Sequence, residues 1–156
     1  MQVTPKPRPH RLAGVTYDQP GPAFHCRLAT WDRIPAFARP DAAQLAVDAL
    51  RFYHGKSVEV LAYCVMPDHV HLLVRIAEGG PSLSRWIGDF KRWVSRAVRK
   101  QLELELTWQP GFFERVIRDT EDLVEAARYV VGNPVRAGLA GNPQDYFWSG
   151  SFVYDL

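Results

Sequence analysis

The chain has little cysteine and no long apolar run. These two absences argue against a disulfide-rich protein and against a membrane-spanning protein. Its two cysteines, Cys26 and Cys64, lie in separate apolar segments without CxxC spacing, which excludes a disulfide framework and favours a reducing compartment. No stretch approaches the roughly 20 apolar residues of a membrane-spanning helix, and residues 1–11 lack the apolar core of a secretory signal. We therefore expect a cytoplasmic protein that does not enter a membrane.

Acidic residues are scarce in two regions of a chain whose formal net charge is only +2. Residues 1–40 hold six Lys or Arg side chains against Asp18 and Asp32, and residues 85–100 hold six against Asp89 alone. Most of the other carboxylates come after residue 100. This asymmetry favours a polyanionic partner such as a nucleic acid.

The apolar pattern predicts one domain with a βαββαβ order and one appended helix. The strands are expected at residues 23–31, 57–65, 69–76 and 111–118, and the helices at residues 40–55, 83–103 and 120–133. This order is typical of the ferredoxin-like split βαβ fold, an α+β class with an antiparallel sheet. Right-handed crossovers place the first two helices on one face of the sheet, so we expect the appended helix on the other face.

The segment Tyr63–Val74 places His69 and His71 one residue apart in an apolar, β-branched strand. Residues i and i+2 of a strand share a face, so the two imidazoles should lie side by side, about 6–7 Å apart at the backbone. Val70 and Leu72 should face a core on the other side. Two neighbouring imidazoles form half of a metal site; the alternative is that they are ordinary core or surface histidines, in which case both would need buried partners.

The appended helix supplies candidates for the second half of such a site. Tyr129 and Asn133 are four residues apart, so they share a face if the helix is continuous. A phenol is a competent nucleophile toward phosphorus, and an amide oxygen is a competent hard ligand. The ordinary alternatives are a half-buried aromatic side chain for Tyr129 and a helix C-cap for Asn133. Gly132 and the constraint before Pro134 make this last turn irregular.

Basic side chains also form a stripe on the long helix expected at residues 83–103. At 100° per residue they fall within an arc of about 60°, opposite an apolar and aromatic side that should face the core. The stripe consists of Arg85, Arg92, Arg96 and Arg99. Such a stripe is either a solvated face or, with a nucleic-acid partner, a surface that contacts successive phosphates of the backbone.

Four segments, in chain order, resemble the motifs of one family. They are Met66–His71, Trp108–Phe112, Tyr129–Leu139 and Trp148–Ser149. The histidine pair is similar to the histidine–hydrophobe–histidine motif of HUH endonucleases, and the whole set resembles the REP-associated tyrosine transposases, solitary bacterial relatives of single-strand insertion-sequence transposases. The resemblance covers about residues 20–150. Arg115 stands where many relatives carry a histidine.

The resemblance implies metal-dependent cleavage and joining of single-stranded, hairpin-containing DNA through a 5′-phosphotyrosine intermediate. Tyr129 would be the nucleophile, His69 and His71 would be metal ligands, and Asn133 would take the position of the third ligand. Mg²⁺ or Mn²⁺ is the ion that the resemblance implies, although these ligands alone also suit zinc, nickel or cobalt.

The resemblance also implies how the chain is organised. Residues 1–156 would form a single HUH transposase-like domain, with a basic extended arm at 1–20, a catalytic core at 21–140 and a tail at 141–156. In this fold the first and third strands are neighbours, so His25 and Arg27 lie on the metal-facing side as candidates for phosphate contact; Arg27 can equally be a solvated side chain. We expect a bacterial, nucleoid-associated monomer without an obligate protein partner, in which Tyr129 acts within its own chain; a dimer is the alternative.

Three other functions fit parts of the pattern. A domesticated relative would bind hairpin DNA without cutting it, but the joint presence of Tyr129, His69 and His71 argues against loss of the chemistry. A small metalloprotein would hold a structural or redox ion at the histidines, but nearby Cys or carboxylate ligands are missing. Replication initiators and relaxases of the same superfamily usually differ in circular order or in the number of tyrosines.

Overall fold

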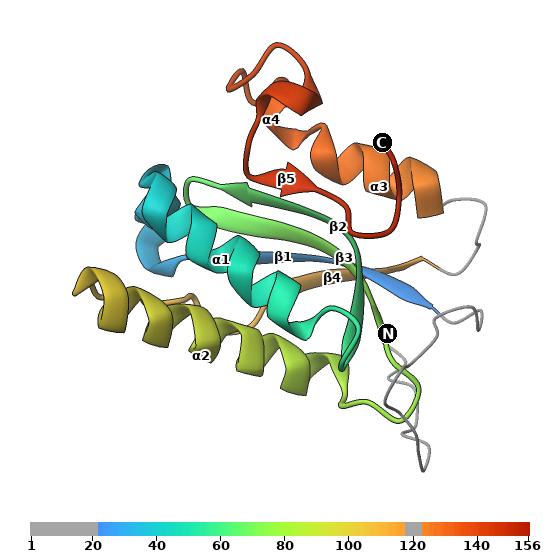
Figure 1. The fold of residues 1–156 in the computed structure, drawn as a ribbon, viewed down its shortest axis with the longest axis horizontal. Coiled ribbons are helices and arrows are strands. Elements are labelled where there is room, and N and C mark those ends of the chain that lie inside the picture. Colours follow the sequence, from blue (N-terminus) through green and yellow to red (C-terminus); the bar gives the residue numbers. More distant parts are fainter. Residues whose placement is uncertain (1–21, 118–122) are drawn as a thin grey trace.

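The computed structural model describes residues 22–117 and 123–156. Its centre is an antiparallel sheet with the strand order β4-β1-β3-β2-β5 (Figure 1). The strands are β1 (Ala23–Ala29), β2 (Val58–Met66), β3 (His69–Ile76), β4 (Phe113–Ile117) and β5 (Ser149–Gly150). The strand that carries both motif histidines is therefore the central one.

Two helices, α1 (Pro40–Tyr53) and α2 (Leu83–Leu102), cover one face of this sheet (Figure 1). The main apolar core lies between them and the strands, and its largest fully buried side chains include Trp86, Phe24 and Phe90. Helix α2 begins where the Ser82 hydroxyl accepts a hydrogen bond from a backbone amide of the first turn, which satisfies a donor that the helix itself leaves unpaired. We call this side of the sheet the α1/α2 face.

A third helix, α3 (Leu123–Val131), lies on the opposite side of the sheet, packed against β2 and β3 (Figure 1). A smaller apolar core beneath it includes Leu73, Cys64, Ala127 and Val130. We call this side the α3 face. The helix covers the β2–β3 half of the face, and exposed side chains of β1 and β4 mark the other half.

Short elements complete the structure. They are the helix α4 (Asn133–Arg136) and the 3-10 turns η1 (Trp31–Arg33), η2 (Ala36–Ala38) and η4 (Pro143–Asp145). The tail returns to the edge of the sheet, where β5 pairs with β2 and the Tyr146 hydroxyl donates a hydrogen bond to the Val65 carbonyl at 2.8 Å. In the part of the chain that the structure describes, no helix has the length and apolar character to cross a membrane.

The predicted ferredoxin-like order and the placement of the helices on two faces are confirmed. The first strand ends at Ala29 because η1 begins two residues later, and the fourth starts at Phe113 because Gly111 adopts a left-handed turn with φ 76°. The β5 strand was not predicted. Cys26 and Cys64 are buried free thiols, as expected. The predicted arm at 1–20 and the first residues of the appended helix lie outside the described residues.

Candidate active site on the α3 face

The alternation of β3 places its histidines and its apolar residues on opposite faces. Val70 and Leu72 are fully buried in the α1/α2 core, as predicted. His69 and His71 point to the other side, with ring centroids 4.9 Å apart. A third imidazole joins them, because β1 pairs with β3 and brings His25 beside His71. Period-two geometry thus gathers three histidines on the α3 face.

The histidine rings form a row of close nitrogen contacts. The Nε2 atoms of His69 and His71 are 3.2 Å apart. On the far side of each ring, His71 Nδ1 lies 3.2 Å from His25 Nε2, and His69 Nδ1 lies 2.7 Å from Asp68 Oδ1. When Asp68 accepts the proton of His69 Nδ1 and His25 accepts that of His71 Nδ1, both facing Nε2 atoms carry lone pairs.

Asp68 is itself held in place by an ion pair. The Arg33 Nε atom donates to Asp68 Oδ2 at 3.2 Å, and Arg33 Nη2 donates to Asp68 Oδ1 at 3.3 Å. Burial opposes ionisation of Asp68, but the hydrogen bonds from His69 and Arg33 outweigh it and hold the pKa of this carboxyl below its ordinary value. Asp68 is therefore an ionised acceptor that orients His69.

The surroundings keep the three imidazoles uncharged. Burial lowers the pKa of His71 to about 3 and that of His25 to about 4, and neighbouring positive charges act in the same direction. Burial also lowers the pKa of His69, against the opposing effect of Asp68. Neutral imidazole is the form that ligates a metal ion.

The geometry of His69 and His71 fits two ligands of one ion. Two nitrogens that each lie about 2.1 Å from the same ion, at angles between octahedral and tetrahedral, are about 3.0–3.4 Å apart, which brackets the observed 3.2 Å. Across residues 22–117 and 123–156, no group of three or more His, Cys, Asp and Glu side chains is arranged to hold a metal ion. Within those residues, a further protein ligand would be of another type.

Helix α3 places Tyr129 beside this row. Its ring is 6.2 Å from the ring of His25, edge to face, and the residue is 52% exposed. The Arg136 guanidinium lies over the same ring, 3.8 Å from its centroid, and donates from Nη2 to the Tyr129 carbonyl at 2.6 Å. Gly132 makes room for this contact, because a Cβ there would lie 2.9 Å from Arg136 Nη1.

Asn133 does not continue the helix of Tyr129. Helix α3 ends at Val131 and Asn133 starts α4, because Gly132 favours a break and Pro134 lacks an amide proton. The Asn133 side chain donates from Nδ2 to the Val130 carbonyl at 2.9 Å. This hydrogen bond fixes the amide plane and uses its nitrogen, so its oxygen is the atom left for a ligand role.

The predicted DNA-contacting residues fall on two different sides of the protein. Arg27 is exposed on the α3 face, opposite His71 in the β1–β3 pairing. His25 is only 8% exposed and directs its Nε2 toward His71, so it contacts the histidine row. The arginine stripe of α2 lies beyond the sheet, on the α1/α2 face, and the structure does not bring it together with the histidines.

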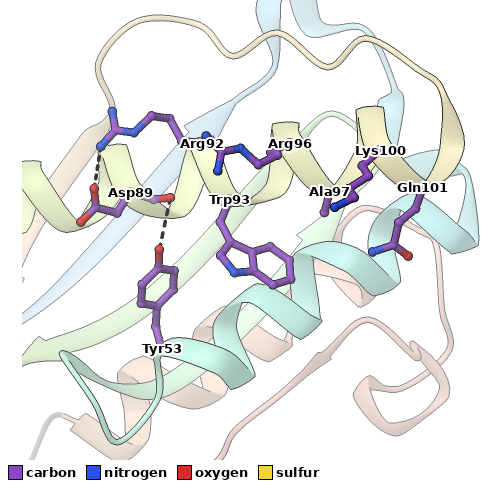
Figure 2. Close-up of a pocket in the computed structure, with 8 residues that line it drawn as sticks. All are labelled: Tyr53, Asp89, Arg92, Trp93, Arg96, Ala97, Lys100 and Gln101. Atoms are coloured by element: carbon purple, nitrogen blue, oxygen red, sulfur yellow. Dashed lines mark hydrogen bonds and ion pairs between the residues drawn. The ribbon is translucent and has the colours of Figure 1, made fainter.

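A groove of about 410 Å³ runs along α2 where the end of α1 approaches it (Figure 2). Arg92, Arg96 and Lys100 line it, together with the Trp93 indole. Arg92 is paired with Asp89, and Arg85 also approaches that carboxylate, at 3.5 Å. The Arg96 and Arg99 side chains make no hydrogen bond or ion pair within the described ranges, so their charges are available to an anion.

The comparisons with known proteins identify the family of this chain. A family model described as "Transposase IS200 like" matches residues 22–132, well over half of the chain, and this match includes both motif histidines and Tyr129. The chain belongs to the IS200-like transposase family. The resemblance to REP-associated tyrosine transposases is also confirmed, by the relatives that follow.

The REP-associated tyrosine transposase of Escherichia coli is 33% identical to this IS200-like chain, over 64% of the chain and 58% of that protein. A Haemophilus influenzae protein that carries the same family designation is 31% identical, over 63% of the chain and 61% of that protein. The chain thus spans about three fifths of the length of these curated relatives. A solved structure of a REP-associated tyrosine transposase bound to a REP hairpin superposes with a TM-score of 0.67 at 22% identity, covering 93% of this chain and 81% of that one. That match confirms the fold.

Sequence reasoning missed several residues around the site of this IS200-like protein. Asp68 directly precedes His69, so its role as an orienting acceptor could have been inferred from the strand start. Arg33 and Arg136 carry no such local signal, because they reach the site from η1 and α4. Arg115 lies opposite His25 in the β1–β4 pairing and adds a positive charge near it.

Proposed function

We propose that this chain cleaves and rejoins single-stranded, hairpin-containing DNA by phosphodiester transesterification, with Tyr129 as the nucleophile. The observation that carries this proposal is the convergence on one face of the sheet of two neutral imidazoles, their Nε2 atoms 3.2 Å apart, and the tyrosine of α3. Membership in the IS200-like transposase family supports it independently.

We further propose that the chain uses a divalent ion, Mg²⁺ or Mn²⁺. His69 and His71 would hold the ion through their Nε2 atoms, with the Asn133 side-chain oxygen as the third ligand. When bound, such an ion neutralises charge on the nonbridging oxygens of a phosphodiester and makes the phosphorus more electrophilic. Asp68 and His25 orient the two imidazoles from their far sides.

In the cleavage step, Tyr129 Oη forms a bond to phosphorus while the bond from phosphorus to the 3′ oxygen breaks. The phenolic proton is lost to a base or to solvent, and the departing 3′ oxygen gains a proton. The products are a 5′-phosphotyrosine and a free 3′-hydroxyl. Because the phosphodiester energy is kept in the tyrosyl ester, the reverse attack of a 3′-hydroxyl rejoins strands without a nucleotide cofactor.

Positive charges around the histidines suit a phosphate backbone. Arg27 and Arg115 are exposed on the neighbouring strands, and Arg136 lies on Tyr129 itself. The arginine stripe of α2 would contact the phosphates of a second stretch of the same DNA, where the DNA passes the edge of the protein. Tyr129 lies beside His25 of its own chain, which supports a monomer acting in cis.

The proposal is tested by incubating the chain with labelled hairpin oligonucleotides and Mn²⁺ or Mg²⁺. We expect a covalent protein–DNA adduct that survives denaturing electrophoresis, disappears with a chelator and is absent in Tyr129→Phe. Tyr53→Phe, a tyrosine of the α1/α2 face, is the matched control and should form the adduct. An adduct that persists in Tyr129→Phe contradicts the assigned nucleophile. Tight hairpin binding without any cleavage would support the binding-only alternative.

A further inference from the structure

The half of the α3 face that helix α3 leaves open carries three exposed side chains in a compact pattern. Helix α3 packs against β2 and β3, whereas Arg27 of β1 and Phe113 and Arg115 of β4 remain exposed. Phe113 is 55% exposed, an unusual position for a large aromatic ring on a strand. We call this set the open platform.

Strand register places the open platform directly beside the histidine row. Arg27 pairs with His71 on one side and with Phe113 on the other. Directly opposed residues of an antiparallel sheet point to the same face. The side chains of His71, Arg27 and Phe113 therefore stand in one line across three strands. With neighbouring strands about 4.8 Å apart, Phe113 lies roughly 10 Å from His71 at the backbone.

The chemistry of the open platform matches a single nucleic-acid strand. The Arg27 guanidinium is 5.7 Å from the centroid of the Phe113 ring, and Arg115 follows two residues after that ring on the same side of β4. The carboxylate between them, Glu114, belongs to the opposite face, where it pairs with Cys26. An exposed aromatic plane flanked by two cations binds bases by stacking and phosphates by charge.

We propose that the open platform binds unpaired nucleotides of the DNA strand next to the scissile phosphate, with the Phe113 ring stacked on one base. Arg27 and Arg115 contact the phosphates on either side of that base. This inference rests on the proposed function for the identity of the strand, and it adds the surface and the residue that hold the strand in position. Phe113 is thus a positioning residue that acts on the substrate strand rather than on the reacting atoms.

The test compares two hairpin oligonucleotides with the same duplex stem, one blunt and one with a short unpaired extension of randomised sequence. Binding is measured by fluorescence anisotropy with the full chain carrying Tyr129→Phe, so that no strand is cut. Stacking contributes about 1–3 kcal/mol per base, so Phe113→Leu should weaken binding of the extended hairpin by about 5- to 150-fold. Binding of the blunt hairpin should not change.

Three further variants keep the result interpretable. Phe113→Trp retains an aromatic plane and should retain the preference for the extended hairpin. Arg115→Ala should lower the slope of log affinity against log salt by about 0.7, whereas Phe113→Leu should leave that slope unchanged. Phe147→Leu, an exposed aromatic at the opposite edge of the sheet, is the matched control and should bind both oligonucleotides as before.

The platform is refuted if Phe113→Leu affects both oligonucleotides equally or neither. Failure of the platform and failure of the proposed function give different results. Cleavage that depends on Tyr129 but binding that ignores Phe113 removes only the platform. Binding that depends on Phe113 in a chain that never forms an adduct removes only the proposed chemistry.

Discussion

The two faces of the central sheet are built from alternate residues of the same strands, yet they differ in almost every physical property. The α1/α2 face is closed by two helices over a continuous apolar core. The α3 face is half covered, and it carries neutral histidines, an exposed tyrosine and a rim of arginines. In β3, Val70 and Leu72 pack into the core of the α1/α2 face, while His69 and His71 lie on the α3 face.

Because of this difference, the residues that stabilise the fold and the residues proposed to react lie on opposite faces of the sheet. Side chains of the α1/α2 face can change the free energy of unfolding without touching the reacting groups, because the sheet lies between them. On the α3 face, a half-covered surface leaves Tyr129 exposed and still buries the imidazoles enough to keep them neutral. The contrast predicts that substitutions on the two faces affect different measurements.

The largest expected effect is on stability and comes from the α1/α2 face. Phe90→Ala should lower the free energy of unfolding by about 3–5 kcal/mol, because Phe90 is fully buried. Tyr129→Phe should change it by no more than about 0.5 kcal/mol, because the phenol is half exposed. Urea denaturation of both variants measures the difference. Comparable losses would show that Tyr129 has a structural role.

The next effect concerns the residue that orients His69. Asp68→Asn removes the charge that fixes the imidazole, and loss of such a partner typically weakens metal binding by about 10- to 100-fold. Calorimetric titration with Mn²⁺ measures this affinity. Asp89→Asn, which changes a carboxylate of the other face, should bind the ion as the parent does. Equal affinity in Asp68→Asn would remove it from the site.

A smaller effect tests whether the α1/α2 face contacts DNA at all. The Arg96 and Arg99 side chains line a groove beside α2 and have no hydrogen-bond or ion-pair partner among the described residues. The double variant Arg96→Ala and Arg99→Ala should lower the slope of log affinity against log salt by about 1.4 to 1.8 for hairpin DNA. Arg51→Ala, on α1, should leave the slope as it is. An unchanged slope in the double variant confines DNA to the α3 face.

The smallest effect concerns the arginine that lies on Tyr129. Gly132→Ala should displace the Arg136 guanidinium, since the new Cβ would lie 2.9 Å from it. An exposed cation–π contact contributes about 0.5–1 kcal/mol, so adduct formation should slow by about 2- to 5-fold. Gly141→Ala, where a Cβ meets nothing within 4 Å, should react at the parent rate. A normal rate in Gly132→Ala would mean that Arg136 does not hold the ring for reaction.

Much of this architecture could be predicted because it depends on local periodicity. Residues 69–76 form a strand with the predicted bounds, and the alternation within it placed both histidines on one face. The long helix was predicted to within one residue, because its apolar spacing and the Ser82 cap are local signals.

What could not be predicted depends on contacts between distant segments. Arg33 reaches Asp68 from a turn in which Asp32 and Arg33 adopt left-handed backbone angles, and no sequence pattern marks that turn. The irregular turn predicted at Gly132 and Pro134 is present as the break between α3 and α4, but the start of a separate helix at Asn133 was not predicted. His25 was predicted as a phosphate contact, a role that remains a prediction, while its burial against His71 depends on strand register.

The most direct test of the central claim is to locate the DNA attachment by mass spectrometry. Trypsin cleavage after Arg128 and Arg136 yields a peptide of residues 129–136 in which Tyr129 is the sole tyrosine. After cleavage of a hairpin oligonucleotide and nuclease digestion, we expect the remaining 5′-nucleotide phosphate on this peptide, at Tyr129. A phosphate adduct on any other residue, with this peptide unmodified, would contradict the account.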